Sequence, residues 1–133
     1  MAIDYGTKKT GIAVTDPLKI IATGLDTVPT YQLWDFLTTY FREEPVEKVV
    51  VGEPKMADGR PVPFQHLIIG LIRKIRKHFP EIEVTTYDER FTSMRAKEII
   101  LKSGVKKKKR RDKTLVDKIS AVLILQDYME EHL

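Results

Sequence analysis

Three short, mainly apolar runs lie at the start of the chain, separated by polar turns. The runs cover about residues 2–5, 11–15 and 20–28. The turns between them contain Gly6, Asp16 and Pro17, which are residue types that favour reversals of the chain. Short runs separated by such turns predict a three-stranded antiparallel meander.

After Pro29 the pattern changes to alternating helices and strands. Apolar residues repeat at helical spacing in four segments. The predicted helices cover about residues 30–41, 64–79, 92–102 and 114–131. Thr30 is the expected N-cap of the first helix. Two short runs, 46–52 and 82–87, have the apolar and β-branched composition of strands.

These elements predict an α/β fold with a five-stranded mixed sheet, in which two parallel strands join the antiparallel meander and helices cover both faces. The first strand takes the centre, because it pairs with the second strand on one side and leaves only its other side for the later strands. Asp4 then lies in the middle of one face. The length of 133 residues is that of one domain.

A carboxylate in a central strand is costly to bury unless a partner compensates its charge. Two other acidic residues fall where this fold can bring them to Asp4: Glu89 at the end of the last strand, and Asp117 in the first turn of the last helix. Ligands gather at the carboxyl ends of parallel strands in such sheets. A cluster of carboxylate oxygens suits Mg²⁺ or Mn²⁺, which can activate a water molecule for phosphodiester hydrolysis.

Each of these residues also has a purely structural interpretation. Asp4 could hydrogen-bond the turn that follows it. Glu89 could pair with Arg90 or Arg95 on the surface. Asp117 could cap its own helix, although it shares a helical phase with apolar residues, so its carboxylate should point inward over the sheet. Capping and metal binding do not exclude each other.

Two further carboxylates are metal-ligand candidates of lower rank. Glu53 follows the strand at 46–52 and could reach the same rim. Asp88 precedes Glu89, and the two side chains must point to opposite sides if the strand continues through them. The sequence does not decide which of the two faces the site.

Four segments carry a family resemblance. They are IDYGTKKTGIAVTD at 3–16, VVG at 50–52 with the nearby Pro54 and Asp58-Gly59, YDERFTS at 87–93, and DKISAVLILQ at 117–126. In this order they resemble the motifs of the YqgF family, whose RNase H-like members are described as Holliday-junction resolvases or pre-16S ribosomal RNA nucleases. The resemblance covers nearly the whole chain.

This resemblance implies one RNase H-like nuclease domain over residues 1–133, with metal-dependent cleavage and a role in 5′-end maturation of small-subunit ribosomal RNA. Carried over by position, the family's acidic residues fall on Asp4, Glu89 and Asp117. Lys9 stands where the family usually has arginine, so the charge is kept and the bidentate geometry is lost.

Composition narrows the possible functions. The chain contains no cysteine, which excludes disulfides, zinc fingers and thiol nucleophiles. It has neither a stretch of the ~20 apolar residues that a membrane span needs nor the pattern of a signal peptide. We therefore expect a cytoplasmic protein with no membrane partner.

The net charge of +4 permits a polyanionic partner. The densest basic run consists of Lys106, Lys107, Lys108, Lys109, Arg110 and Arg111. It leads directly into the helix with Asp117, so we expect it to hold phosphates together with Lys9 and Arg90, although a solvated loop is the simpler alternative. The basic residues at 73–77 are interpreted as an ordinary outward helix face, with nucleic-acid contact as the alternative.

The sequence thus predicts a nuclease that holds Mg²⁺ or Mn²⁺ with Asp4, Glu89 and Asp117. Its expected substrate is a ribosomal RNA precursor or branched DNA, and it would act as a monomer or homodimer. A non-catalytic nucleic-acid-binding or scaffold protein with a vestigial site is the alternative from another class. A nucleotide-binding protein like the actin- and sugar-kinase-like ATPases would need a duplicated domain, for which 133 residues are too few.

Overall fold

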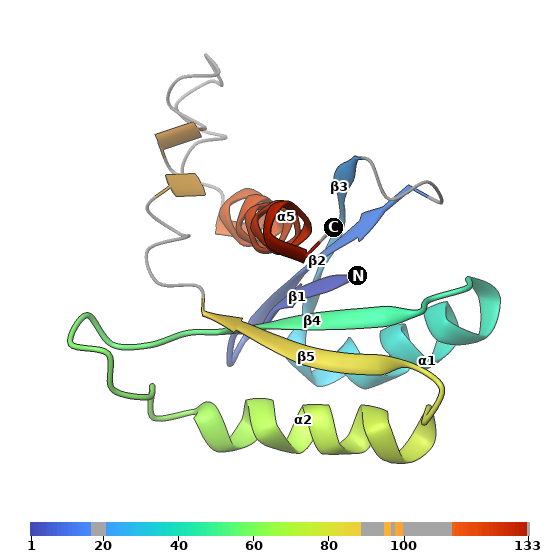
Figure 1. The fold of residues 1–133 in the computed structure, drawn as a ribbon. Helices are drawn as coiled ribbons and strands as arrows, with labels where there is room; N and C mark the ends of the chain where they lie inside the picture. Colours follow the sequence, from blue (N-terminus) through green and yellow to red (C-terminus); the bar gives the residue numbers. More distant parts are fainter. Residues whose placement is uncertain (17–20, 89–94, 97, 100–112, 133) are drawn as a thin grey trace.

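The computed structural model describes residues 1–16, 21–88, 95–96, 98–99 and 113–132 (Figure 1). Within them lies a sheet of five strands in the order β3-β2-β1-β4-β5. The strands are β1 (Ala2–Asp4), β2 (Lys9–Thr15), β3 (Ala22–Pro29), β4 (Lys48–Glu53) and β5 (Glu83–Asp88). β1 pairs antiparallel with β2 and parallel with β4. The predicted mixed sheet with a central first strand is confirmed.

Helices lie on both faces of this sheet, as predicted. They are the short η1 (Thr30–Gln32), α1 (Leu33–Glu43), α2 (Gln65–His78) and α5 (Lys113–His132). α1 and α2 cover one face and α5 covers the other (Figure 1). The helix predicted at 92–102 falls mostly outside the described residues. No helix in the described ranges is both long and apolar enough to span a membrane.

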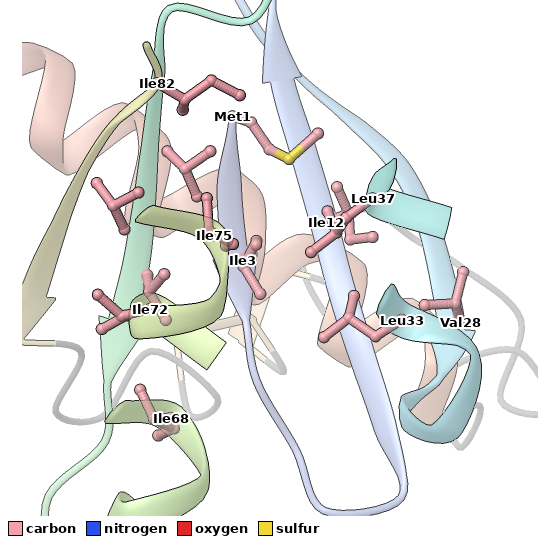
Figure 2. Packing of buried hydrophobic residues seen from close by; sticks show 13 residues of the cluster. Met1, Ile3, Ile12, Val28, Leu33, Leu37, Ile68, Ile72, Ile75 and Ile82 are labelled. Carbon is pink, nitrogen blue, oxygen red and sulfur yellow. The ribbon is translucent and has the colours of Figure 1, made fainter. Parts of the chain in front are cut away.

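The two faces of the central strands differ in the size of their side chains. Figure 2 shows the face covered by α1 and α2, where Ile3 and Ile12 meet Leu37 and Ile75. The face covered by α5 carries alanines and glycine at the alternate positions, including Ala2. Each large aliphatic side chain buried in such a core contributes about 1.5–3 kcal/mol. Small side chains on the other face let α5 lie close to the strands.

The hydroxyl of Thr30 ties the turn after β1 to the start of η1. Thr30 Oγ1 donates a 2.6 Å hydrogen bond to the carbonyl oxygen of Gly6 and lies 2.9 Å from Thr10 Oγ1. No side-chain cap bond is present at the start of η1 or α1, so the predicted N-cap role of Thr30 was wrong. The Thr30 hydroxyl bonds across the turn because this contact gives the buried Thr10 hydroxyl a hydrogen-bond partner.

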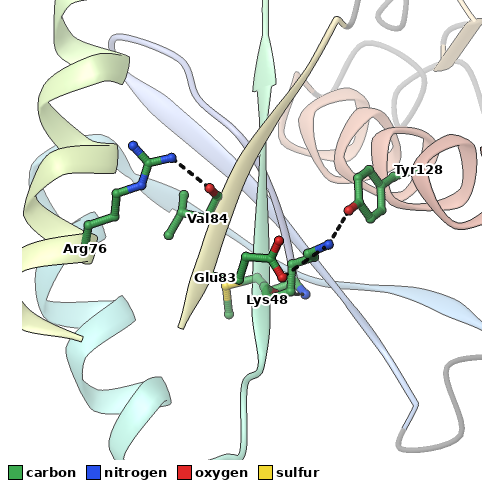
Figure 3. A network of polar contacts seen from close by, with 6 residues as sticks. Lys48, Arg76, Glu83, Val84 and Tyr128 are labelled. Atoms are coloured by element: carbon green, nitrogen blue, oxygen red, sulfur yellow. Dashed lines mark hydrogen bonds and ion pairs between the residues drawn. The ribbon is translucent and has the colours of Figure 1, made fainter. Parts of the chain in front are cut away.

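Polar contacts hold the layers together at the other end of the sheet (Figure 3). Lys48, the first residue of β4, donates a hydrogen bond to the Tyr128 hydroxyl of α5 and lies 3.5 Å from the Glu83 carboxylate of β5. The Tyr128 contact raises the pKa of Lys48. On the opposite face, Arg76 of α2 donates a 2.9 Å hydrogen bond to the carbonyl oxygen of Val84.

Candidate active site

Asp4 projects from the central strand toward helix α5. It is the last residue of β1 and lies directly opposite Gly11 of β2. Side chains alternate along a strand, so Asp4 shares the face of Ala2. Ala2 packs against Ala121 of α5. The carboxylate of Asp4 therefore lies on the α5 face. The sequence predicted that Asp4 lies on one face of the sheet, without saying which helix covers it.

Gly11 brings Asp117 next to Asp4. Directly opposed residues of antiparallel strands project to the same face, so a side chain on Gly11 would point at α5 beside Asp4. A methyl group there would come within 2.1 Å of the Asp117 carbonyl oxygen. The backbone of α5 at Asp117 thus rests on β2 at the residue paired with Asp4. Asp117 itself is half-buried, and its Oδ2 atom is shielded from solvent.

A second glycine extends this close packing of α5 to the next strand. Gly24 of β3 faces Lys118, and a methyl group on Gly24 would lie 2.6 Å from Lys118 Cγ. Gly24 pairs with Ala13 of β2, which also packs against α5. The first turns of α5 therefore lie over a floor of glycine and alanine, and the position of Asp117 is set by main-chain contact.

The lower-rank candidates Glu53 and Asp88 lie elsewhere. They pair with each other across β4 and β5, two residues after Val51 and Thr86 respectively, so they share the α1/α2 face of Val51. Glu53 Oε1 accepts a 3.2 Å hydrogen bond from Gln65 at the start of α2. Asp88 Oδ2 lies 3.6 Å from Lys55 Nζ. The structure does not bring either of them to the α5 face with Asp4.

Three predicted parts of the site lie outside the described residues: Glu89, Arg90 and the basic run at 106–111. Of the arginines suggested as surface partners of Glu89, Arg95 pairs with Asp127 of α5, at 2.7 Å between Nη1 and Oδ2. Within the described ranges, no three His, Asp or Glu side chains form a group that could hold a metal ion. Asp4 and Asp117 are thus two carboxylates of the predicted three.

The first residue of β2 supplies a cation on the same side. Lys9 is exposed and stands two residues before Gly11 in β2, so its side chain is on the α5 face. Tyr5 points the other way, with its ring 6.3 Å from that of Phe64, and burial raises the pKa of its hydroxyl. The surface near Asp4 therefore combines two carboxylates with an exposed lysine.

Sequence reasoning missed the role of Gly11. A glycine inside a strand often marks the close approach of another backbone, so the signal was present in the chain. It also missed the threonine pair that fixes the turn after Asp4, because a contact between Thr10 and Thr30 crosses from one element to another and leaves no periodic pattern.

The donor chemistry at Asp4 and Asp117 fits a hard divalent cation, which prefers carboxylate oxygens. The five-stranded mixed sheet with helices on both faces is an RNase H-like α/β fold. Nucleases with this fold generally use divalent metal ions. The class defined by fold and site is therefore that of RNase H-like proteins.

Comparison with known proteins identifies the family. The model of the RuvX family, described as Holliday junction resolvase, matches residues 1–131, and the chain belongs to this family. The predicted resemblance to YqgF-type proteins is thereby confirmed. Resolvases are nucleases, so the family is one of hydrolases that act on phosphodiester bonds.

Curated relatives match over almost their full length. A protein of Phocaeicola vulgatus is 51% identical over 130 residues, which are 98% of this chain and 94% of the relative. One of Christiangramia forsetii is 52% identical over 131 residues, or 98% and 97% of the two chains. One of Flavobacterium johnsoniae is 50% identical over 129 residues, or 97% and 94%. All three carry the name "Putative pre-16S rRNA nuclease".

Proposed function

We propose that this chain is a divalent-metal-dependent nuclease that matures the 5′ end of pre-16S ribosomal RNA in the cytoplasm. The observation that carries this proposal is the seat of Asp117 on Gly11, beside the strand partner Asp4. It supports the proposal because the backbone of Asp117 rests on the residue paired with Asp4, on the face to which Asp4 projects. The names of the curated relatives support the choice of RNA.

Asp4, Asp117 and Glu89 are the proposed ligands of Mg²⁺ or Mn²⁺. Glu89 is chosen over Asp88 because Asp88 lies on the α1/α2 face with Lys55, and adjacent residues of a strand point to opposite sides. When bound, a divalent ion would polarise the phosphate that reacts and lower the pKa of a water molecule. The carboxylates of Asp4 and Asp117 would orient that ion on the α5 face of the central strand.

The cations beside the site would position the substrate. Lys9 projects from the same face as Asp4 and is exposed, so it is suited to contact a phosphate next to the one that reacts. We assign the same role to Arg90 and to the basic run at 106–111. Such contacts bind without reading sequence, and their strength falls with salt.

Replacing Asp4 with Asn tests the proposal. Asp4→Asn keeps the shape of the side chain and removes its charge, so cleavage of a precursor RNA should fall to background. Circular dichroism and thermal unfolding should show an intact fold. Asp26→Asn is the matched control, because Asp26 is an exposed carboxylate on the edge strand β3, which is separated from β1 by β2. Full activity of Asp4→Asn in a clean preparation would refute the assignment.

A resolvase activity is the second candidate, and the description of the matching family model favours it. Symmetrical cutting of a four-way junction needs two active sites, so this function would require a homodimer. Cleavage of a precursor RNA and of a four-way DNA junction should be compared at equal protein concentration. If the chain binds RNA but turns over neither substrate at any Mg²⁺ or Mn²⁺ concentration, it is a binding or scaffold protein.

A further inference from the structure

The outward face of α2 has an unusual charge pattern. The helix contains Arg73, Lys74, Arg76 and Lys77 and no acidic residue. Its buried residues, Ile68, Ile72 and Ile75, face the sheet. At 3.6 residues per turn, the line opposite to them passes through His66, Gly70, Arg73 and Lys77. We call these four residues the outer stripe.

The cations of α2 divide into two groups. Arg76 donates a hydrogen bond to the carbonyl oxygen of Val84, and Lys74 Nζ lies 4.3 Å above the ring of Trp34. Arg73 and Lys77 are exposed, and neither forms an ion pair with any residue that the structure describes. The outer stripe therefore presents two exposed positive charges that no described residue neutralises in an ion pair.

Gly70 lies at the middle of the outer stripe. Glycine is unfavourable in a helix interior, where only proline is worse. Packing within the described structure gives no reason for it, because a methyl group on Gly70 would meet nothing within 4 Å. The missing side chain leaves the helix backbone open to close approach from outside, with Arg73 and Lys77 on the same line.

We propose that the outer stripe is a second nucleic-acid contact, which binds the phosphate backbone of the substrate beyond the catalytic site. Charge complementarity selects a polyanion, and the identity of that polyanion rests on the proposed nuclease function. The stripe begins near Gln65, which contacts Glu53 at the carboxyl end of β4, the end of the sheet where β1 finishes with Asp4. From His66 to Lys77 it spans about 16 Å, or roughly five nucleotide spacings.

The test is the affinity of a long hairpin RNA for the full chain, measured by fluorescence anisotropy in EDTA across a range of salt. Arg73→Glu combined with Lys77→Glu should weaken binding and lower the slope of log affinity against log salt by about two, because each lost phosphate contact contributes about 0.9. Arg42→Glu is the matched control. Arg42 is an exposed cation in the last turn of α1, next to Glu43 and Glu44, and its reversal should leave the slope unchanged.

A second variant separates binding from folding. Gly70→Gln adds a side chain where there is room, so the melting temperature should stay equal or rise. The same variant should bind the hairpin RNA several-fold more weakly, because the added side chain blocks the close approach. A purely structural role for Gly70 would leave RNA affinity unchanged, and that result would count against the proposal.

Other results would also overturn it. The proposal fails if the Arg73→Glu, Lys77→Glu double variant binds RNA with the affinity and salt slope of the wild type. It also fails if Arg42→Glu loses as much RNA affinity as the double variant. Polyglutamate serves as a model of an acidic protein. If the double variant binds RNA as the wild type does but no longer binds polyglutamate, the stripe binds an acidic protein instead. Binding in EDTA does not depend on turnover, so a chain that binds through the stripe but never cleaves would refute only the nuclease function.

Discussion

Gly11 lets the backbone of α5 at Asp117 approach β2 at the residue paired with Asp4, so the spacing of the two proposed ligands would depend on it. Any side chain at this position collides with main-chain atoms, which cannot move aside as the end of a flexible side chain can. Gly70 provides the opposite case, with open space around it.

These two glycines allow a matched pair of substitutions. Gly11→Ala should destabilise the fold by about 3 kcal/mol or more, because the strand and α5 must separate. Gly70→Ala should stabilise it by about 1 kcal/mol through helix propensity. Urea unfolding measures both free energies. Equal stability of Gly11→Ala and wild type would show that α5 does not rest on β2 at this point.

Thr10 and Thr30 form a second residue-scale test. Replacing Thr30 with Val leaves the buried Thr10 hydroxyl and the Gly6 carbonyl without this partner, at a cost of about 1–3 kcal/mol. Thr10→Val should cost less when Thr30 is already Val, because the contact is then gone. A double-mutant cycle from urea unfolding measures this coupling. Strictly additive effects would mean that the two hydroxyls do not interact.

The residues of the candidate site were only partly predictable. Asp4 and Asp117 could be selected from the sequence, because one is a charge in a strand and the other shares a helix phase with apolar residues. Strand alternation predicted that Asp88 and Glu89 take opposite sides if the strand continues through both, and Glu89 lies outside the described residues. Alternation could not show which side α5 covers, since that depends on contacts between distant elements. The contacts of Glu53 and Asp88 with Gln65 and Lys55 place them on the other face.

At the scale of elements, the sequence predicted the strand order well. The three-strand meander leaves only one free side of β1, so the later parallel strands had to join there, and the register of β1 with β4 confirms it. The capping of α1 was predicted wrongly. A threonine before a helix has the composition of a cap, but here its hydroxyl bonds a turn that lies 24 residues earlier in the chain.

Side-chain truncation tests how helix α5 packs on the sheet. Its residue Ile124 is fully buried between the helix and the strands, whereas Ile69 of α2 is 41% exposed. Ile124→Ala should cost about 2–5 kcal/mol through lost transfer energy and a residual cavity. Ile69→Ala should cost under about 0.5 kcal/mol. Thermal and urea unfolding test the contrast, and similar losses at the two positions would contradict the packing described for α5.

At the scale of the whole molecule, the sheet has one bulky face and one thin face. Large aliphatic residues fill the layer under α1 and α2, whereas under α5 the strands β1 and β2 contribute the small Ala2 and Ala13. The thin layer places the helix backbone against the strands, and the proposed site lies within it.

Metal binding should be visible in the stability of the folded chain. An ion that binds only the native state stabilises it by about 2.7 kcal/mol at a concentration of 100 times its Kd. Mn²⁺ should therefore raise the melting temperature of the wild type and of Asp26→Asn, and EDTA should reverse the change. Asp4→Asn should respond little, while being equally or more stable without metal because one of two neighbouring charges is gone. The same Mn²⁺ response in Asp4→Asn would exclude this residue as a ligand.

The contact between Gly11 and the Asp117 carbonyl oxygen has an evolutionary consequence. If Asp4 and Asp117 are the ligands proposed above, their spacing depends on how closely α5 approaches the strands, and a side chain on Gly11 would push the two apart. Selection on the reaction should therefore act on the smallest side chains of β2 and β3 as strongly as on the acids. A larger side chain at one of these positions would displace the proposed metal ligands even though every acidic residue was still present.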